Sequence, residues 1–166
     1  MPIEIKLNIT GDEFYINALQ SIGVDMKDFT EPFNMVYEDF KVLEKQNFDA
    51  EGTPEKFKAL SPQYQQWKNK HYPGKRIMQL TGRLYNALVG TSSDTIKTIT
   101  ARSATFGSKL PYDHRHQYGT VGMPQRKIIQ IKDTGDVAIQ ERWEGIFRKW
   151  IRLVLDRHGF KQAVTE

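Results

Sequence analysis

The first part of the chain changes from alternating apolar positions to apolar positions three or four residues apart. Apolar and polar side chains alternate over residues 3–9, which predicts a half-buried strand. Thr10 and Glu13 have the spacing of a capping box, so we expect a helix to begin there and to run to about Ile22. Gly23 is the expected end of this helix.

A second amphipathic segment predicts a helix over residues 31–46, with Pro32 in its first turn. Its apolar stripe consists of Phe33, Val36, Tyr37, Phe40 and Leu43. Turn-forming residues over 50–62 then predict an extended loop. Ser61 as N-cap and Pro62 at the first helical position predict the start of a short helix.

The middle of the chain predicts one more helix and then several strands. Residues 77–90 are expected to be helical, because leucines recur at every fourth position, and Gly90 is the expected stop. These leucines are Leu80, Leu84 and Leu88. Runs rich in β-branched and aromatic residues predict strands at 95–103, 104–108 and 126–132.

The end of the chain has the widest apolar stripe and predicts a long C-terminal helix with Asp133 as its cap. The stripe residues follow one another at spacings of four and three: Ile139, Trp143, Ile146, Trp150 and Leu153. Phe147, Ile151 and Val154 widen this stripe. Arg157 and His158 suit the negative end of the helix dipole, and Gly159 follows as a stop signal.

The predicted strands and helices do not follow a regular β–α–β alternation, so the expected fold class is α+β. We expect a small antiparallel sheet packed with several helices, including the long C-terminal amphipathic helix, in a single domain over residues 1–166. The chain has no cysteine, which excludes a disulfide framework and a thiolate nucleophile. No apolar run approaches the roughly 20 residues that span a bilayer, and no signal-peptide segment is visible, so we expect a cytosolic origin and no membrane partner.

Charge is distributed unevenly, although the formal net charge is only +4. Residues 1–50 hold 4 Lys and Arg against 10 Asp and Glu, a net charge of −6. Residues 51–132 hold 14 against 4, a net charge of +10, and residues 133–166 are neutral. A basic middle beside an acidic flank favours either polyanion binding or complementary contacts between subunits. A solvated basic surface without a partner is the third interpretation.

The segment "LPYDHRHQYGT", residues 110–120, places two histidines one residue apart. A metal-dependent hydrolase would need further ligands, and neither Asp113 nor His71 completes a recognised ligand spacing. In a helical turn, His114 and His116 would point about 200° apart and could not bind one ion. The sequence also has no GxSxG, Walker, GxGxxG or HExxH motif. We therefore expect no catalytic residue, no metal site and no cofactor, and a protein that is not an enzyme.

Three segments occur in an order that is typical of one protein family. They are "FDAEGTPEKFKALSPQYQQWKNKHYPGKRIMQLTGRLYNAL", "FGSKLPYDHRHQYGT" and "GMPQRKII". Over residues 48–131 the chain resembles the tailed-phage virion morphogenesis proteins, the tail-completion proteins of contractile-tailed phages. It departs from the family pattern at Asp113, where alanine is usual, and at Lys127 and Ile128, where Pro-Phe is usual.

The resemblance implies a structural role for the residues that match the family motifs. These residues are Ser61, Pro62, Thr81, Gly82, Leu84, His116, Gln117, Gly119, Pro124 and Arg126. His116 and Gln117 belong to an HQ-aromatic-G element, so their side chains are expected to tie a loop to neighbouring backbone. Gly119 is expected to permit a turn with a positive φ.

The resemblance further implies a virion protein of the neck or tail, assembled in the host cytoplasm, that completes the tail and helps to join it to the DNA-filled head. The implied form is a homo-oligomeric ring, with a hexamer as one option, in contact with other neck and tail proteins such as the connector, the tail terminator or the tube. Such a ring surrounds the path of the DNA. Its candidate contacts with neighbouring subunits, or with phage DNA without sequence specificity, are Lys68, Lys70, Lys75 and Arg76.

The alternative hypothesis is a small basic nucleic-acid-binding module. Its candidate stacking residues lie among the same basic side chains: Tyr64, Trp67, Tyr72 and Tyr85. No recognised DNA- or RNA-binding motif accompanies them. Ring formation by the purified protein, or salt-dependent DNA binding, would separate the two hypotheses.

Overall fold

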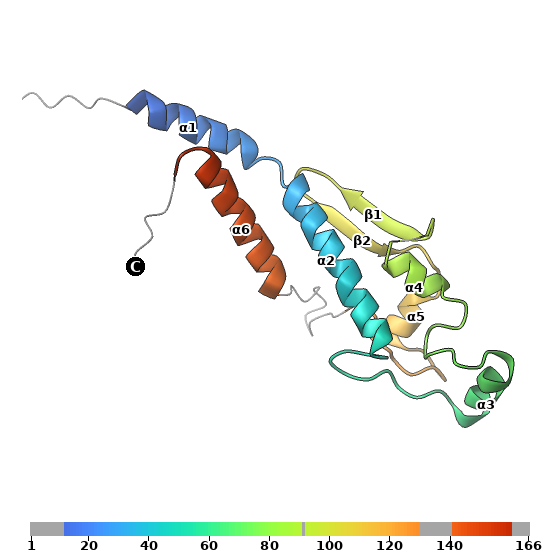
Figure 1. Cartoon of the computed structure of the whole chain (residues 1–166). Coiled ribbons are helices and arrows are strands. Elements are labelled where there is room, and N and C mark those ends of the chain that lie inside the picture. The colour runs from blue at the N-terminus through green and yellow to red at the C-terminus, as the bar shows by residue number, and fades with distance from the viewer. Residues whose placement is uncertain (1–11, 91, 130–140, 161–166) are drawn as a thin grey trace, which may run out of the picture.

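Residues 12–90, 92–129 and 141–160 are described by a computed structural model of the chain. The molecule is elongated, with α1 at one end, α3 at the other and α2 along the middle (Figure 1). The elements in chain order are α1 (Asp12–Asp25), α2 (Thr30–Asp49), α3 (Pro62–His71), α4 (Arg83–Leu88), β1 (Thr95–Ile99), β2 (Ala104–Ser108), α5 (Asp113–Tyr118) and α6 (Glu141–Arg157).

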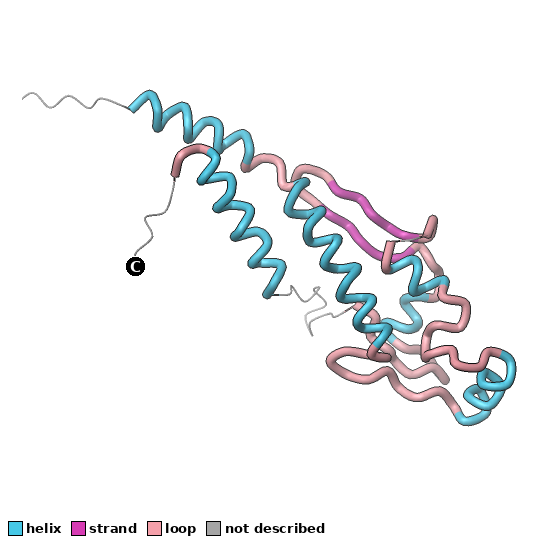
Figure 2. The backbone as a smooth tube through the Cα atoms, in the orientation of Figure 1, coloured by secondary structure: helices cyan, strands magenta, loops and turns pink. Residues whose placement is uncertain are grey.

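Helix α2 lies at the centre of the fold because other elements cover it on two sides. Figure 2 shows α6 on one side of α2 and the strands on the other, and α2 also contacts α4. The apolar stripe predicted for this helix is confirmed, since Val36, Tyr37 and Phe40 are buried. Burial of this stripe against its neighbours is the main favourable contribution to folding. The buried core cluster consists of Tyr37, Phe40, Phe48, Leu84, Ala87, Leu88, Leu110 and Ile128.

The sheet of the described residues is the antiparallel pair β1 and β2, in which Thr95 lies opposite Ser108 and Ile99 opposite Ala104. The Phe106 ring lies 5.0 Å from a core ring of α2, that of Tyr37. The predicted strand at 104–108 is confirmed, and the strand predicted at 95–103 is shorter, because it ends at Ile99.

Helix α6 packs on the rest of the fold through aromatic rings and buried aliphatic side chains. Trp150 is only 4% exposed, and its ring centroid lies 4.9 Å from that of Phe29. The Phe147 ring lies 6.3 Å from the same phenylalanine. Val154 is fully buried, whereas Leu153 is 47% exposed. The predicted amphipathic helix and the burial of Val154 in its stripe are confirmed, whereas Leu153, expected in the same stripe, is exposed.

Start and stop signals in the sequence explain several helix boundaries. The Oγ of Ser61 accepts a hydrogen bond from the backbone N–H of Tyr64 (3.4 Å), and Pro62 occupies the first turn of α3, as predicted. Gly90 follows the C-cap residue Val89 and has a φ of 76°, which is the left-handed conformation expected of a helix stop.

Two predicted boundaries are wrong. Gly23 lies inside α1, which continues to Asp25, where the carboxylate is bonded to the His158 ring at the end of α6 (2.9 Å). Leu80 precedes α4, because Gly82 takes a left-handed φ of 74° at the N-cap and the helix begins only after it.

Several predictions lie outside the described residues: the strand over 3–9, the caps at Thr10 and Asp133, and the position of Ile139. The α+β fold class, with a small antiparallel sheet and a long C-terminal helix, is confirmed. Among the described helices, none combines the length and the apolar character that crossing a membrane requires.

Candidate functional site

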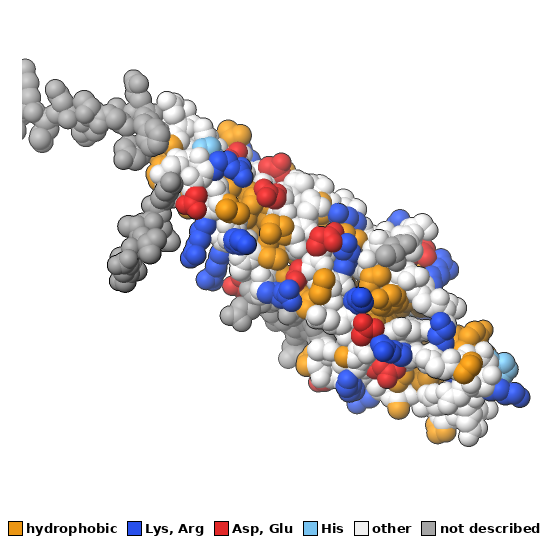
Figure 3. Space-filling model, in the orientation of Figure 1, with side chains coloured by type: hydrophobic (Ala, Val, Ile, Leu, Met, Phe, Trp, Pro, Cys, Tyr) orange, Lys and Arg blue, Asp and Glu red, His pale blue; other side chains and the backbone are white. Residues whose placement is uncertain are grey.

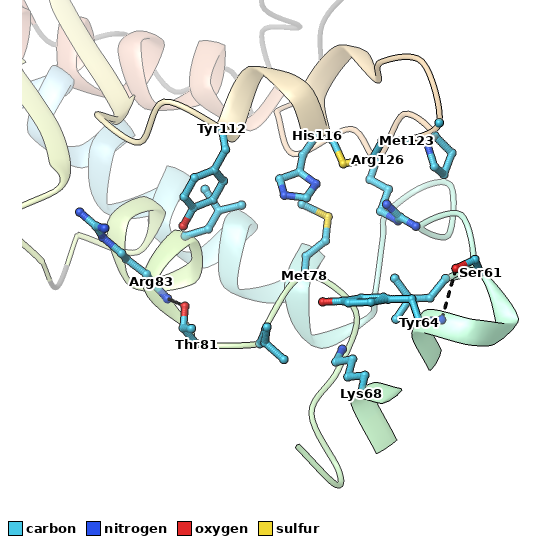
Figure 4. A pocket seen from close by; sticks show the side chains of 15 residues that line it. Ser61, Tyr64, Lys68, Met78, Thr81, Arg83, Tyr112, His116, Met123 and Arg126 are labelled. Carbon is cyan, nitrogen blue, oxygen red and sulfur yellow. Dashed lines mark hydrogen bonds between the residues drawn. The ribbon is translucent and has the colours of Figure 1, made fainter. Parts of the chain in front are cut away.

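Six of the ten motif residues line one cavity at the α3 end of the molecule. The cavity has a volume of about 570 Å³, and its walls come from α3, from the segment that leads into α4, from α5 and from residues 122–126 (Figure 4). The motif residues in its walls are Ser61, Thr81, Leu84, His116, Pro124 and Arg126. The fold therefore brings distant motif positions into one site. Ser61 and Arg126, for example, are 65 residues apart in the chain.

Arg126 ties the chain before α3 to the opposite wall of the cavity. Its guanidinium donates to the backbone carbonyls of Lys58 (2.7 Å) and Ala59 (3.0 Å), and the residue is buried. Its backbone N–H donates to the carbonyl of His116 (2.8 Å), so it also links α5 to the segment that follows. A planar guanidinium with donors in fixed directions suits this task better than a lysine would.

Gln117 holds the backbone of residues 128–129 in the way that a neighbouring strand would. Its amide oxygen accepts from the N–H groups of Ile128 (2.8 Å) and Ile129 (2.9 Å), and its amide nitrogen donates to the carbonyl of Ile129 (2.7 Å). Asn47 on α2 donates to the carbonyl of Ile128 (2.9 Å). Because side chains satisfy these backbone groups, the strand predicted at 126–132 is wrong for residues 126–129; the remainder lies outside the described residues.

Gly119 ends α5 in a conformation that only glycine adopts easily at this place. Its φ is 76°, and a Cβ added here would lie 2.9 Å from the backbone nitrogen of Gln125. The predicted positive φ is therefore confirmed, and the close approach of the two backbones adds a second reason for glycine.

The imidazole of His116 differs from the expected structural tie. The residue is half-buried, and its Nδ1 has no hydrogen-bond partner among the described residues. Burial and, after it, the Arg126 charge lower the pKa of His116, so the ring is neutral near pH 7. The loop is tied by Gln117 and by the backbone oxygen of His116, and the prediction that the imidazole does so is wrong.

His114 and His116 do not form a pair, because they lie on a helical turn, α5, and His114 is exposed. The structure therefore has the helical turn in which these two side chains are expected to point apart. Within residues 12–90, 92–129 and 141–160, no group of three or more His, Cys, Asp or Glu residues could hold a metal ion.

The four candidate basic residues do not form one exposed patch. Lys68 is 2% exposed and donates to the carbonyl of Arg76, and burial lowers the pKa of its ammonium group. Arg76 in turn donates to the carboxylate of Asp49 (2.8 Å). Lys70 and Lys75 remain exposed. Lys68 lines the cavity and therefore does not provide the surface contact expected of it, whereas Lys70 and Lys75 are exposed and have no ion-pair partner among the described residues.

An aromatic ladder runs along the outside of α3, defined here as Tyr64, Trp67, His71 and Tyr72. The Tyr64 and Trp67 rings stack at 5.4 Å, and the Trp67 and His71 rings stack at 5.1 Å. The three larger rings of the ladder remain 40–42% exposed, and orange and blue side chains gather at this end in Figure 3. Tyr85, the fourth candidate stacking residue, instead packs edge-on against the core residue Phe48.

Much of the acidic charge of the first 50 residues is used inside the fold. Asp25 pairs with Arg157 (3.6 Å) and His158, and Asp39 pairs with Arg142. Glu44 is buried, and burial raises the pKa of its carboxyl group to about 8. In contrast, residues 56–93 contain 7 Lys and Arg and no Asp or Glu. Part of the acidic flank is thus compensated within the fold, whereas residues 56–93 contribute only positive charge.

Comparison with known proteins finds one family. A sequence profile described as the phage virion morphogenesis family matches residues 13–147. No curated protein and no solved structure matches the chain. The match includes every residue of the cavity wall.

Proposed function

Since the chain belongs to the phage virion morphogenesis family, we propose that it is a structural protein of the head–tail junction, without catalytic activity, that completes the tail and helps to join it to the DNA-filled head. Family membership makes it a virion assembly protein associated with the virion. What we propose beyond this is that the protein is located in the neck and that it acts through contacts between subunits.

The observation that supports this role best is the convergence of the motif residues on the wall of one cavity beside exposed aromatic rings. The motif side chains hold loops in place, as Arg126 and Gln117 do, and so they present the aromatic ladder on a fixed frame. Tyrosine and tryptophan are enriched at protein interfaces and often contribute much of the binding energy. Preorganised exposed aromatics are therefore what a docking surface requires.

The proposed assembly is a homo-oligomeric ring that contacts other neck and tail proteins: the connector, the tail terminator or the tube. The elongated chain has two unlike ends, and unlike surfaces are what head-to-tail contacts in a ring require (Figure 1). A ring of this kind would surround the DNA path, so a contact with phage DNA without sequence specificity belongs to the same proposal.

The test uses phage that carry the double substitution Lys70→Glu and Lys75→Glu. Both lysines are exposed, so the protein should fold normally, and the docking surface should meet like charge where it requires opposite charge. Electron microscopy of lysates should then show filled heads and tails that remain separate.

The matched control is Lys45→Glu with Lys149→Glu, which changes the net charge equally at two exposed positions on α2 and α6. Control phage should contain joined particles at normal yield. The proposal is wrong if both variants give joined, infectious particles, because the positive charge at the α3 end would then have no role in joining.

The second candidate function is a nucleic-acid-binding module, and the stacked Tyr64 and Trp67 rings near exposed lysines favour it. Titration of the purified protein with single-stranded and duplex DNA at several salt concentrations tests it. Micromolar binding that weakens steeply with salt and is lost in Trp67→Ala would support this candidate. Unchanged binding in that variant would exclude the ladder as a stacking surface.

A further inference from the structure

The cavity under α3 has an apolar floor and cationic side chains that use only some of their donors within the described residues, and this combination indicates the chemistry of an occupant. Its apolar walls come chiefly from Leu60, Met78, Leu80, Leu84 and Met123. No Asp or Glu lines it, whereas three cationic side chains and His116 do. A volume of about 570 Å³ lies within the range of roughly 300–1,000 Å³ that is typical of ligand pockets.

Hydrogen-bond donors in the walls exceed the acceptors that the fold supplies. The Lys68 ammonium group can donate three hydrogen bonds and is seen to make one, to the carbonyl of Arg76. Arg126 has five donors and uses two on the carbonyls of Lys58 and Ala59. The Nδ1 of His116, which donates in one tautomer of the neutral ring and accepts in the other, has no partner among the described residues. Buried cations that keep unused donors are stabilised by an anionic acceptor.

Met78 supplies the apolar part of the site at a conformational cost. Its φ is 63°, a left-handed conformation that is unfavourable for residues other than glycine. In Figure 4 the Met78 thioether, the His116 ring and the Tyr64 ring face the same space. A flexible and polarisable methionine adapts to apolar side chains of different shapes, and methionines are frequent at surfaces that bind peptides.

We infer that this cavity receives an apolar side chain from an acidic segment of another neck or tail protein, an inference that rests on the proposed function. The apolar anchor occupies the space between Met78 and Leu84, and a flanking carboxylate accepts from Lys68, Arg126 and His116. The rest of the segment crosses the aromatic ladder toward Lys70 and Lys75. Charge favours a partner other than a second copy, because Asp25, Asp39 and Asp49 are paired with Arg157, Arg142 and Arg76 inside the chain's own fold.

A protein segment also fits the cavity better than nucleic acid does. A polynucleotide would stack on the outer faces of the ladder and place its phosphates near Lys70 and Lys75, and it would leave the apolar floor empty. The floor of Met78, Leu80 and Leu84 requires an aliphatic or aromatic side chain that can enter it.

The experiment selects binders from a random dodecapeptide library against the purified full-length protein. We expect the selected peptides to place Leu, Met or Phe beside Asp or Glu, and fluorescence anisotropy then measures the Kd of the best one. Replacing its Asp and Glu with Asn and Gln should weaken binding by about tenfold or more, because charge-assisted hydrogen bonds are lost.

Two variants of the protein test the location of the peptide. Thr81→Trp places a large side chain at an exposed position on the cavity wall and should abolish binding. Lys68→Met keeps the length of the side chain and removes its charge, so it should weaken binding of the acidic peptide about tenfold but leave the Asn/Gln version unchanged. The matched control is Thr98→Trp on β1, an exposed position outside the cavity, which should bind as the wild type does.

The inference is overturned if no peptide is selected, if the selected peptides have no excess of acidic residues, or if Thr81→Trp binds them normally. Loss of self-association in Thr81→Trp would instead identify a second copy as the occupant, and DNA binding that requires the open cavity would identify nucleic acid. These outcomes would overturn the peptide-binding inference without overturning the proposed function. The Lys70→Glu, Lys75→Glu phage tests joining, and its result does not depend on whether the cavity binds a peptide.

Discussion

The two ends of this molecule use their polar side chains in different ways. At the α1–α6 end, side chains pair with one another: His158 binds Asp25 (2.9 Å), and the Trp150 indole donates to Glu31 (3.2 Å). At the α3 end, Arg126 donates to the backbone carbonyls of Lys58 and Ala59, and its guanidinium has no carboxylate partner among the described residues. At the first end, polar side chains are thus used on one another, whereas at the second the exposed Lys70 and Lys75 keep positive charge available for a partner.

Trp150→Ala, at the α1–α6 end, is expected to lower the stability of the fold most. The side chain is 4% exposed and packs on Phe29, so its truncation should lower the free energy of unfolding by about 3–5 kcal/mol. Chemical denaturation followed by circular dichroism measures this. The control Leu153→Ala removes an exposed side chain from the same helix and should cost less than about 1 kcal/mol. A near-neutral Trp150→Ala would mean that this face of α6 contributes little to folding of the free protein.

Gln117→Ala tests whether side-chain to backbone bonds hold the α3 end together. Three hydrogen bonds to Ile128 and Ile129 would be lost, and we expect a destabilisation of about 2–4 kcal/mol, since buried backbone groups would lack partners. Urea denaturation gives the magnitude, with the exposed Gln66→Ala on α3 as control. Equal stability of the two variants would show that water replaces the glutamine without cost.

Glu44 predicts a pH dependence that comes from the centre of the fold, between the two ends. Its pKa is raised to about 8 by burial, from an ordinary value of 4.5. Between these values the unfolded chain releases the proton while the folded chain keeps it, so stability should fall as pH rises, by at most about 1.4 kcal/mol per pH unit. Below pH 4.5 both states are protonated, and the contribution disappears.

Glu44→Gln should therefore match the wild type near pH 4.5 and exceed its stability at pH 8 by up to roughly 4 kcal/mol. Thermal and urea denaturation across this range measure the difference. Glu38→Gln, an exposed change on the same helix, should leave the dependence of stability on pH unaltered. If Glu44→Gln and Glu38→Gln both show the same change in stability with pH as the wild type, the Glu44 carboxyl group ionises normally in the folded protein.

The smallest expected difference in stability is at the floor of the cavity, between Met78→Gly and Met78→Ala. Glycine usually destabilises a folded protein relative to alanine, but at a φ of 63° the order should reverse by about 0.5–1 kcal/mol. Differential scanning calorimetry resolves a change of this size in a 166-residue chain. A more stable alanine variant would mean that the left-handed conformation at this position is not retained.

Local signals in the sequence predicted much of the fold, and contacts between distant segments explain the errors. Ser61 with Pro62 identified the start of α3, and the residues of β2 had a strand composition. Residues 126–129 have the composition of a strand, but Gln117 and Asn47 satisfy part of their backbone, and neither bond follows from a local pattern. Similarly, the burial of Lys68 depends on the carbonyl of Arg76, which lies beyond the end of its helix.

The candidate site was predictable only through the order of the family motifs. Its walls come from segments between Leu60 and Arg126, and no periodicity relates such positions to a common cavity. One available signal was missed. Glu44 follows Phe40 by four positions and precedes Phe48 by four, which places a carboxyl group on the buried face of α2.

The absence of acidic residues from positions 56–93 has a consequence for the timing of assembly. Two free copies that approach through their α3 ends repel each other, whereas an acidic partner is attracted before any contact forms. The range of this attraction is set by the Debye length, about 8 Å at physiological ionic strength, so the encounter rate should depend strongly on salt and the lifetime of the finished joint much less. Salt would then act as a control on when the joint forms, and the buried contacts would determine how long it lasts.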